Sequence, residues 1–376
     1  MNSNDILGGH CDTKFSRVAD VLRENIAAER EAGAAVAVYA GGKPVVDIWG
    51  GMADPEAGAA WAEDTIVCAF SVSKAFVSTM GHILIDRDDL DLDATVATYW
   101  PEFAQSGKDG ILVRHLFDHR AALTYVDADL QPGDVYDWYT MTAALAASAP
   151  NWPPGETPVY MNLTFGYLLG EVIRRITGKR IGQFLREDLG GPLGLEYHFA
   201  LTAEEDARCA PVIRRGPPPP AMESGSPAAL SMRGLGANED FNSSAWRGAE
   251  IGSGSGHGTA RSIARLLCAV GRGGALDGVR IMSEAAASRA VTYSCESVDP
   301  VFGVHNRFAL GYQMGTPDVP MGPNPNAFGH MGASGGIGWY DPGTGVAFAY
   351  VNNLWHDQGD LEICRGRLID AVFAAL

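Results

Sequence analysis

The chain of 376 residues is 46% hydrophobic and 19% charged, a composition typical of a globular protein with sizeable apolar cores. Its length predicts two or three lobes, or one large discontinuous domain. The 45 acidic against 28 basic residues give a net charge of −17, which disfavours phosphate backbones and anionic lipid surfaces. We therefore expect neither a nucleic-acid partner nor a membrane role, and no apolar run is long enough to cross a bilayer.

The start of the chain and its cysteines both bear on location. Residues Met1 to Asp5 carry neither the basic nor the apolar block of a secretory signal, which predicts a cytoplasmic protein. The cysteines are scattered, with no C-x-x-C pair, so we expect reduced and mostly buried thiols. They are Cys11, Cys68, Cys209, Cys268, Cys295 and Cys364.

The first seventy residues predict one helix and a hairpin. Apolar residues repeat every three or four positions over 13–30, which predicts an amphipathic helix. Residues 34–40 and 44–49 are predicted strands joined by a tight Gly41-Gly42 turn. A further short strand is expected over 65–70.

Helical spacing dominates the next two hundred residues, beginning at Ser71. The clearest helices are predicted over 141–147, 165–177, 181–189, 259–270 (capped by Thr259) and from Ser283 onward. The stretch 210–256 interrupts this pattern with Pro217 to Pro220 and many Gly and Ser residues, and we expect an ordered irregular loop there.

Strands return near the end of the chain, before a closing helix over 361–373. They are expected over 309–314, 326–331, 337–340 and 346–351, the last two flanking the turn Asp341-Pro342-Gly343.

Strands at both ends with helices between them predict an α/β (α+β) fold, in which both termini build one antiparallel sheet flanked by helices. The expected division is a discontinuous α/β domain of residues 1–70 plus 285–376 and a mainly helical domain of residues 71–284. Because clefts form where two lobes meet, the site is expected at their interface.

A serine and a lysine share one helical face at the start of this helical region. Lysine occurs at only five positions, and one of them, Lys74, lies in the most apolar helix, three residues after Ser71. A desolvated amine loses its proton more easily and can act as a base towards the hydroxyl. An isolated S-x-x-K also fits a serine N-cap followed by a lysine that extends to water.

Two further short motifs follow along the chain. Tyr160-Met161-Asn162 lies in a loop before a helix, where the phenol could shuttle protons and the amide could hold the base or a carbonyl. His330-Met331-Gly332 lies on a predicted strand, where the glycine would let a ligand approach and the next N–H could face an oxyanion. A second Y-x-N, Tyr350 to Asn352, is interpreted as a packing element.

The order S-x-x-K, Y-x-N, H-x-G resembles the serine β-lactamase and penicillin-binding-protein superfamily, and more narrowly the class C β-lactamase-like, family VIII carboxylesterases. Supporting stretches span nearly the whole chain: residues 45–51, 89–93, 256–261, 328–330 and 341–342.

The resemblance implies a role for each motif residue. Ser71 would be the acylated nucleophile, with Lys74 and Tyr160 as the proton-transfer pair. The resemblance also implies the remaining site: Asn162, His330 and Gly332 for substrate binding, with the backbone N–H groups of Ser71 and Ala333 as the oxyanion hole. Ser334 is a further candidate for the pocket wall, and no metal or organic cofactor is expected.

One departure from the family pattern bears on the substrate. The lysine of the K-T-G element is replaced by His330, which is mostly neutral at pH 7 and suits uncharged esters better than the β-lactam carboxylate. We expect a serine hydrolase of small to medium carboxylic esters. The alternatives are an amidase, β-lactamase or acyltransferase using the same site, or a non-catalytic ligand-binding relative.

Other patterns favour structural readings. Residues 332–336 match the G-x-S-x-G elbow of α/β-hydrolases, but a hairpin rather than a helix is predicted after Ser334. His115 and His119 have zinc-helix spacing without the general-base Glu, and the Gly-rich run 252–256 lacks the spacing of a phosphate loop. Six aromatic residues are candidates for an acyl pocket, although each such residue is more often part of the core and the sequence does not rank them: Trp138, Tyr139, Trp152, Phe241, Trp246 and Trp339.

Overall fold

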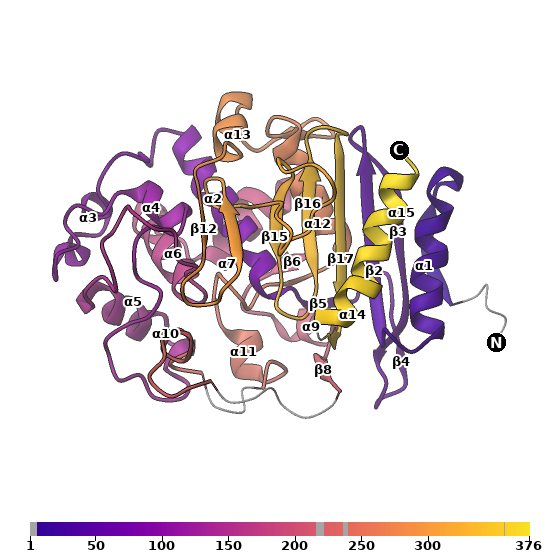
Figure 1. The fold of residues 1–376 in the computed structure, drawn as a ribbon, viewed down its shortest axis with the longest axis horizontal. Helices are drawn as coiled ribbons and strands as arrows, with labels where there is room; N and C mark the ends of the chain where they lie inside the picture. The colour runs from indigo at the N-terminus through magenta and orange to yellow at the C-terminus, as the bar shows by residue number, and fades with distance from the viewer. Residues whose placement is uncertain (1–5, 216–221, 236–239, 357) are drawn as a thin grey trace.

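The structure, a computed structural model, describes residues 6–215, 222–235, 240–356 and 358–376. Its central feature is an antiparallel sheet in the order β1-β3-β2-β17-β16-β15-β14-β13-β12, with the short β4 paired to β3 (Figure 1). The strands are β1 (Leu7–Cys11), β2 (Gly33–Ala40), β3 (Lys43–Asp54), β4 (Ala59–Ala60), β12 (Cys295–Val298), β13 (His305–Phe308), β14 (Gln313–Met314), β15 (Phe328–Met331), β16 (Ile337–Asp341) and β17 (Val346–Asn352).

The two ends of the chain meet in the middle of this sheet. Strand β2 pairs with β17 in continuous register, from Ala40 opposite Val346 to Ala34 opposite Asn352. Both strands are almost entirely buried, and they read as continuous apolar runs because both faces of the sheet are covered. The predicted fold class, an antiparallel sheet assembled from both termini, is confirmed.

Different helices cover the two faces of the sheet. On one face α1 (Ser16–Ala27) and α15 (Arg367–Ala374) lie side by side (Figure 1) and bury an apolar cluster that includes Leu22 and Trp339. On the other face α12 (Ala260–Gly271) packs against β2, β16 and β17. Helix α2 (Ser73–Asp86), which contacts β15, is buried along almost its whole length, and both Ser71 and Lys74 of the S-x-x-K motif are buried.

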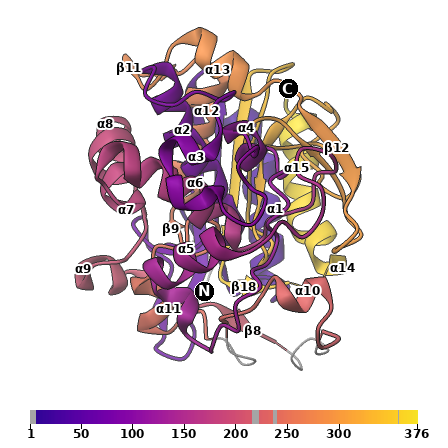
Figure 2. The same ribbon diagram turned by 90° about the vertical axis from the view of Figure 1, so that its left-hand side faces the viewer.

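The remaining helices lie mostly on the side away from α1 and α15 (Figure 2). They are α3 (Val96–Tyr99), α4 (Val113–Phe117), α5 (Trp138–Ala147), α6 (Thr164–Thr177), α7 (Ile181–Phe184), α8 (Gly191–Leu193), α9 (Ala203–Asp206), α10 (Pro227–Leu230), α11 (Ser244–Gly248), α13 (Glu284–Ala290) and α14 (Gln358–Leu361). A small second sheet joins β6 (Tyr197–His198), β9 (His257–Gly258), β5 (Ile66–Cys68) and β7 (Cys209–Ala210). Two short pairs complete the strands: β10 (Ala275–Leu276) with β11 (Val279–Arg280), and β8 (Ile213–Arg214) with β18 (Leu354–Trp355). None of the helices in the described ranges has the length and apolar character needed to cross a bilayer.

Several boundaries differ from those predicted. The first helix ends at Ala27 rather than at residue 30. The predicted strand 309–314 shrinks to β14, because Gly311 adopts a φ of +91° and its N–H donates to the carbonyl of Ala309 in a tight turn. Strands β1, β12 and β13 were not predicted. Short elements interrupt the irregular stretch 210–256, and Pro217 to Pro220 lie outside the described residues.

Candidate active site

Ser71 lies at the point where the chain turns from strand to helix. Strand β5 ends at Cys68, residues Phe70–Val72 form a 3₁₀ turn, and α2 begins only at Ser73, so Ser71 precedes the helix that was predicted to begin with it. Phe70 adopts a φ of +47°, a left-handed conformation that costs a residue with a side chain of order 1–3 kcal/mol. Its ring packs edge-on against Phe241 and Trp355, and this packing holds the turn.

The amine of Lys74 is fully buried and faces the serine. Its Nζ lies 3.1 Å from the Ser71 Oγ and 3.2 Å from the carbonyl oxygen of Ser253, and it lies 4.6 Å from the centre of the Tyr160 ring. Among the described residues no carboxylate forms an ion pair with it. Burial lowers the pKa of Lys74 well below its usual value, so the neutral amine is favoured.

Glycine and a serine hydroxyl fix the carbonyl that faces Lys74. The Oγ of Ser253 donates to the carbonyl of Leu163 at 2.6 Å, just before α6. A Cβ atom on Gly166 would lie 2.4 Å from the backbone nitrogen of Ser253, so only glycine at that position lets this segment approach the helix. The Gly-rich run 252–256 therefore supplies a contact to the Lys74 amine rather than a phosphate cradle.

Two consecutive backbone N–H groups, those of Tyr160 and Met161, donate hydrogen bonds that hold the loop carrying Tyr160. The N–H of Tyr160 donates to the Oδ2 of Asp299 at 2.7 Å, and the N–H of Met161 donates to the Nδ1 of His119 at 3.0 Å. Burial raises the pKa of the Tyr160 phenol, against a smaller lowering by a hydrogen bond with the Ser71 hydroxyl. The phenol is therefore protonated near neutral pH and available as a proton donor.

His115 and His119 do not form a zinc helix. Helix α4 ends at Phe117, and His119 lies beyond it with a φ of +62°. The His119 ring packs 5.0 Å from the ring of Tyr160, while the Nδ1 of His115 accepts from the N–H of Leu112. Both histidines have structural partners, in agreement with the structural interpretation of this pair.

The H-x-G motif, His330 to Gly332, lies at the end of β15, which contacts the turn that carries Ser71. A Cβ atom on Gly332 would lie 2.5 Å from the carbonyl oxygen of Ala69, so glycine is required for this approach. The Gly332 N–H donates to Gly336 at 2.7 Å, whereas the N–H of Ala333 has no hydrogen-bond partner in the part of the chain that the structure describes.

His330 is buried beside these groups and is uncharged. Its Nδ1 donates to the carbonyl of Met331 at 2.8 Å. Burial, with a smaller contribution from the nearby Lys74, lowers the pKa of His330 to about 3. The histidine at the position of the K-T-G lysine therefore carries no positive charge at pH 7.

A cavity of about 260 Å³ brings most of the predicted site residues together. Ser71, Tyr160, Asn162, Gly332 and Ala333 line it, together with Phe302, Val304, Asn306, Gln313 and Met331. None of these ten residues is charged. Neither His330 nor Ser334 is among the lining residues; both are buried, and Ser334 is followed by the hairpin of β16 and β17 rather than by a helix.

The aromatic lining of this cavity comes from residues other than the candidates named from the sequence. None of the six candidate aromatic residues lines it, and its aromatic lining residues are Tyr160 and Phe302. Trp339 lies on the opposite face of the sheet, where it stacks on Phe348, and Phe241 and Trp246 contact Phe70 instead. Sequence reasoning also missed Ser253, Asp299, Asn306 and Gln313, because no local motif marks them.

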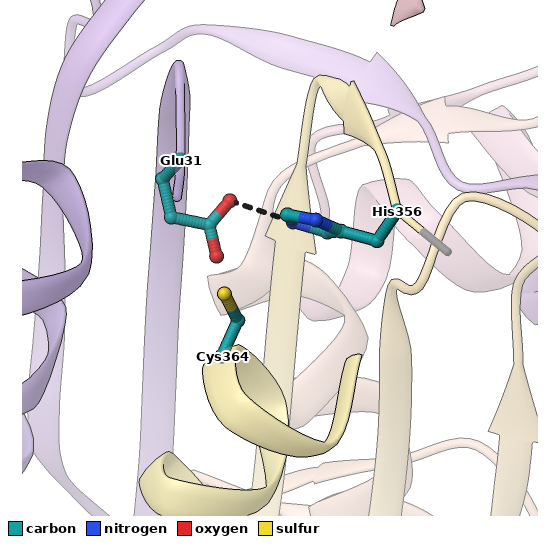
Figure 3. A group of neighbouring side chains, drawn as sticks. All are labelled: Glu31, His356 and Cys364. Atoms are coloured by element: carbon teal, nitrogen blue, oxygen red, sulfur yellow. Dashed lines mark hydrogen bonds and ion pairs between the residues drawn. The ribbon is translucent and has the colours of Figure 1, made fainter. Parts of the chain in front are cut away.

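A separate cluster of Glu31, His356 and Cys364 has side chains that could bind a metal (Figure 3). The Glu31 carboxylate already accepts from the hydroxyl of Tyr350 and faces the Nε2 of His356 at 3.1 Å. Burial and the neighbouring Glu31 raise the pKa of the Cys364 thiol to about 12. Because metal binding requires the thiolate, this donor set fits a hydrogen-bonded structural network better than a metal centre.

Comparison with known proteins identifies the family of the chain. The model of the beta-lactamase family matches residues 18–373. The chain is 34% identical to the esterase/beta-lactamase LipL of Mycobacterium tuberculosis, over 92% of this chain and 82% of the relative.

Two solved structures are similar along their whole length. A penicillin-binding-protein homologue from Caulobacter crescentus has 34% identity and a TM-score of 0.90, covering 98% of this chain and 100% of that one. A family VIII carboxylesterase has 33% identity and a TM-score of 0.89, with the same coverage. The resemblance found from the motifs is confirmed, and the chain belongs to the beta-lactamase family.

Proposed function

We propose that this serine hydrolase cleaves small to medium carboxylic esters through an acyl-enzyme on Ser71. The observation that carries the proposal is a fully buried amine, without an ion-pair partner among the described residues, whose Nζ lies 3.1 Å from the Ser71 hydroxyl. A neutral amine at this distance can accept the hydroxyl proton as the oxygen attacks. The relatives named as esterases support the same reaction class.

The proton returns to the leaving group in this mechanism. Lys74 takes the proton of Ser71 while the Oγ forms a bond to the ester carbonyl carbon. As the bond from that carbon to the alcohol oxygen breaks, Tyr160 donates its phenolic proton to the alcohol and regains one from the Lys74 ammonium. Water then attacks the acyl-enzyme by the same steps in reverse order, and the carboxylic acid leaves. No metal or organic cofactor takes part.

The backbone N–H groups of Ser71 and Ala333 are the proposed oxyanion hole. The Ala333 N–H has no partner among the described residues, so it is free to donate to the tetrahedral oxyanion. Each such donor contributes roughly 2.7–4 kcal/mol to the lowering of the barrier. Asn162 lines the same cavity and is proposed to contact substrate.

The electrostatics of the site favour uncharged esters. The cavity walls are uncharged, and both Lys74 and His330 are favoured in their neutral forms. A carboxylate in the substrate would therefore lose its hydration without gaining a cation. We propose that β-lactams, amides and acyl transfer to other alcohols are slower reactions of the same site, with His330 and Ser334 shaping the site from behind its walls.

The test is the variant Ser71→Ala, assayed with p-nitrophenyl acetate and butyrate and with nitrocefin. We expect a loss of at least about 10³-fold in kcat/KM for the esters, and faster wild-type turnover of esters than of nitrocefin. Ser78→Ala is the matched control, because Ser78 lies on α2, the helix that follows Ser71, and its hydroxyl donates to the carbonyl of Gly311. Mass spectrometry after organophosphonate treatment locates the label. Full esterase activity in Ser71→Ala would refute the assignment.

We further propose a cytoplasmic location and the division into residues 1–70 plus 285–376 and residues 71–284. All six cysteines are free thiols, which supports a reducing compartment. Fractionation of the producing cells tests the location.

Limited proteolysis followed by mass spectrometry tests the proposed division into two domains. A first cut within a helix of either domain would contradict this division.

A further inference from the structure

Two buried amide side chains form part of the cavity wall and carry no role in the mechanism above. Asn306 lies on β13 and Gln313 on β14, and only 4% and 5% of their surfaces are exposed. Both line the cavity beside Ser71 and Tyr160. Burying an amide is costly unless its polar atoms are hydrogen-bonded, so the partners of these two side chains indicate what the wall is built to do.

The backbone of β15 fixes the orientation of Gln313. The N–H of Met331 lies 3.1 Å from the Oε1 of Gln313, and a backbone N–H can only donate. The oxygen of the Gln313 amide therefore faces Met331 and its nitrogen faces away. A reversed amide would place two donors against each other.

The orientation of Asn306 follows from that of Gln313. The Nε2 of Gln313 donates to the Oδ1 of Asn306 at 3.3 Å, so the oxygen of the asparagine is committed to this bond. Its Nδ2, with two N–H donors, has no partner among the residues that the structure describes. A fixed and almost fully buried donor thus lines the cavity of the nucleophile without an acceptor.

We propose that Asn306 is a specificity-determining residue whose Nδ2 donates to an oxygen of the bound ester other than the oxygens of the reacting ester group. This inference rests on the proposed function and names its substrate class. The preferred substrates are uncharged esters with an ether, hydroxyl or carbonyl oxygen in the group that fills the cavity. The carbon atoms of that group contact the apolar wall of Phe302, Val304 and Met331.

The chemistry of the wall selects an uncharged acceptor. No charged side chain lines the cavity to offset a carboxylate or an ammonium group. A purely alkyl group would leave the Asn306 donor desolvated and unpaired, which is unfavourable. An oxygen at the right position removes that penalty, so the site discriminates between two esters of nearly the same size and shape.

The test compares matched ester pairs in which one CH₂ group is replaced by oxygen. The acyl pair is p-nitrophenyl butyrate and p-nitrophenyl methoxyacetate, and the alcohol pair is butyl acetate and 2-methoxyethyl acetate. For each pair we define the oxygen preference as the ratio of kcat/KM for the ether ester to kcat/KM for the alkyl ester. Because intrinsic reactivity cancels between enzymes, the change in this ratio on substitution reports the contact alone.

In Asn306→Leu we expect the oxygen preference to fall about three- to tenfold for one pair, and the pair affected identifies the half of the ester that fills the cavity. Val304→Ala is the control, since it alters the same wall without removing a donor and must change both esters of a pair by the same factor. Thermal unfolding checks that the variants are folded, and Asn306→Ala replaces the leucine variant if that one does not fold.

The experiment distinguishes a failure of the inference about Asn306 from a failure of the proposed function. If the wild type cleaves the alkyl esters and the oxygen preference is the same in both Asn306 variants for both pairs, the inference about Asn306 is wrong while the proposed function stands. If the wild type cleaves none of the four esters, the proposed function itself fails.

Discussion

The backbone N–H of Tyr160 donates to the buried carboxylate of Asp299, a residue 139 positions further along the chain, at 2.7 Å. The other carboxylate oxygen accepts from the N–H groups of Val301, at 2.8 Å, and Phe302, at 3.0 Å. One side chain therefore fixes both the loop that presents the phenol and the segment that supplies the aromatic wall of the cavity. Asp299 acts through these groups, so it is a positioning residue.

Substitution Asp299→Asn tests this positioning role. The amide has one acceptor where the carboxylate has two, so one of its N–H groups must face a backbone donor. We expect the free energy of unfolding to fall by about 1–3 kcal/mol and kcat for p-nitrophenyl esters to fall more than KM changes. Denaturant unfolding and steady-state kinetics measure the two effects.

Asp91→Asn is the matched control, because this exposed carboxylate also accepts a backbone N–H, that of Asp93 at 2.9 Å. Its effect should remain within about 0.5 kcal/mol. A kcat unchanged in Asp299→Asn would mean that Tyr160 does not depend on this contact.

Gly332 offers a direct test of the proposed oxyanion hole. In Gly332→Ala the new methyl group would lie 2.5 Å from the carbonyl oxygen of Ala69, so the end of β15 must move away from the Ser71 turn. We expect kcat to fall about 10²- to 10³-fold, the loss associated with one misplaced oxyanion donor.

Gly336 supplies the matched control four residues later. A Cβ atom there would meet its nearest neighbour, the carbonyl oxygen of Tyr350, at 3.5 Å, an ordinary contact distance. Gly336→Ala should therefore retain kcat within a few-fold of the wild type. Equal losses in the two variants would indicate a general effect on the turn rather than on the donor at Ala333.

The parts of this site that could be predicted from the sequence are pairs of residues that lie close together along the chain. Ser71 with Lys74, and Tyr160 with Asn162, are recognisable because a helical turn or a loop brings neighbours together. The order of the motifs, with strands at both ends, was sufficient for the fold class.

The rest depends on pairs that only the folded chain creates. The carbonyl of Ser253 reaches Lys74 across 179 positions, and a backbone carbonyl leaves no side-chain signal in a sequence. Asn306 lies on β13, a four-residue strand whose only apolar residue is Phe308, so the strand was missed together with the role of Asn306. Phe302 was missed for a similar reason, because the sequence does not distinguish an aromatic residue that lines a cavity from one that packs in the core.

The proposed role of Lys74 as the base predicts a pH dependence of the reaction. Burial lowers the pKa of the amine, and only its neutral form accepts the Ser71 proton, so kcat/KM should rise with pH through a limb well below 10.5 and then level off. The raised pKa of Tyr160 keeps its phenol protonated, so no falling limb from this group is expected near neutrality. The profile of kcat/KM between pH 5 and 9, with an uncharged ester, tests for the rising limb and for the absence of a falling one.

Lys74→Met should lower kcat at least about 10³-fold at every pH in that range, because no base remains. Lys108→Met is the control, since Lys108 is also buried but its amine donates to three carbonyls, those of Gln105, Ala146 and Ser148. That variant should lose stability while its folded fraction keeps the kcat of the wild type.

The same lowered pKa makes a prediction about stability. Between the pKa of Lys74 in the folded protein and its unfolded value of about 10.4, the unfolded chain binds more protons than the folded one, so the free energy of unfolding rises with pH. Lys74→Met removes this contribution. Its stability relative to the wild type should therefore decline with increasing pH, by up to about 1.4 kcal/mol per pH unit in that window. A difference that stays constant in urea unfolding from pH 7 to 9.5 would mean that the amine is already charged in the folded protein and cannot serve as the base.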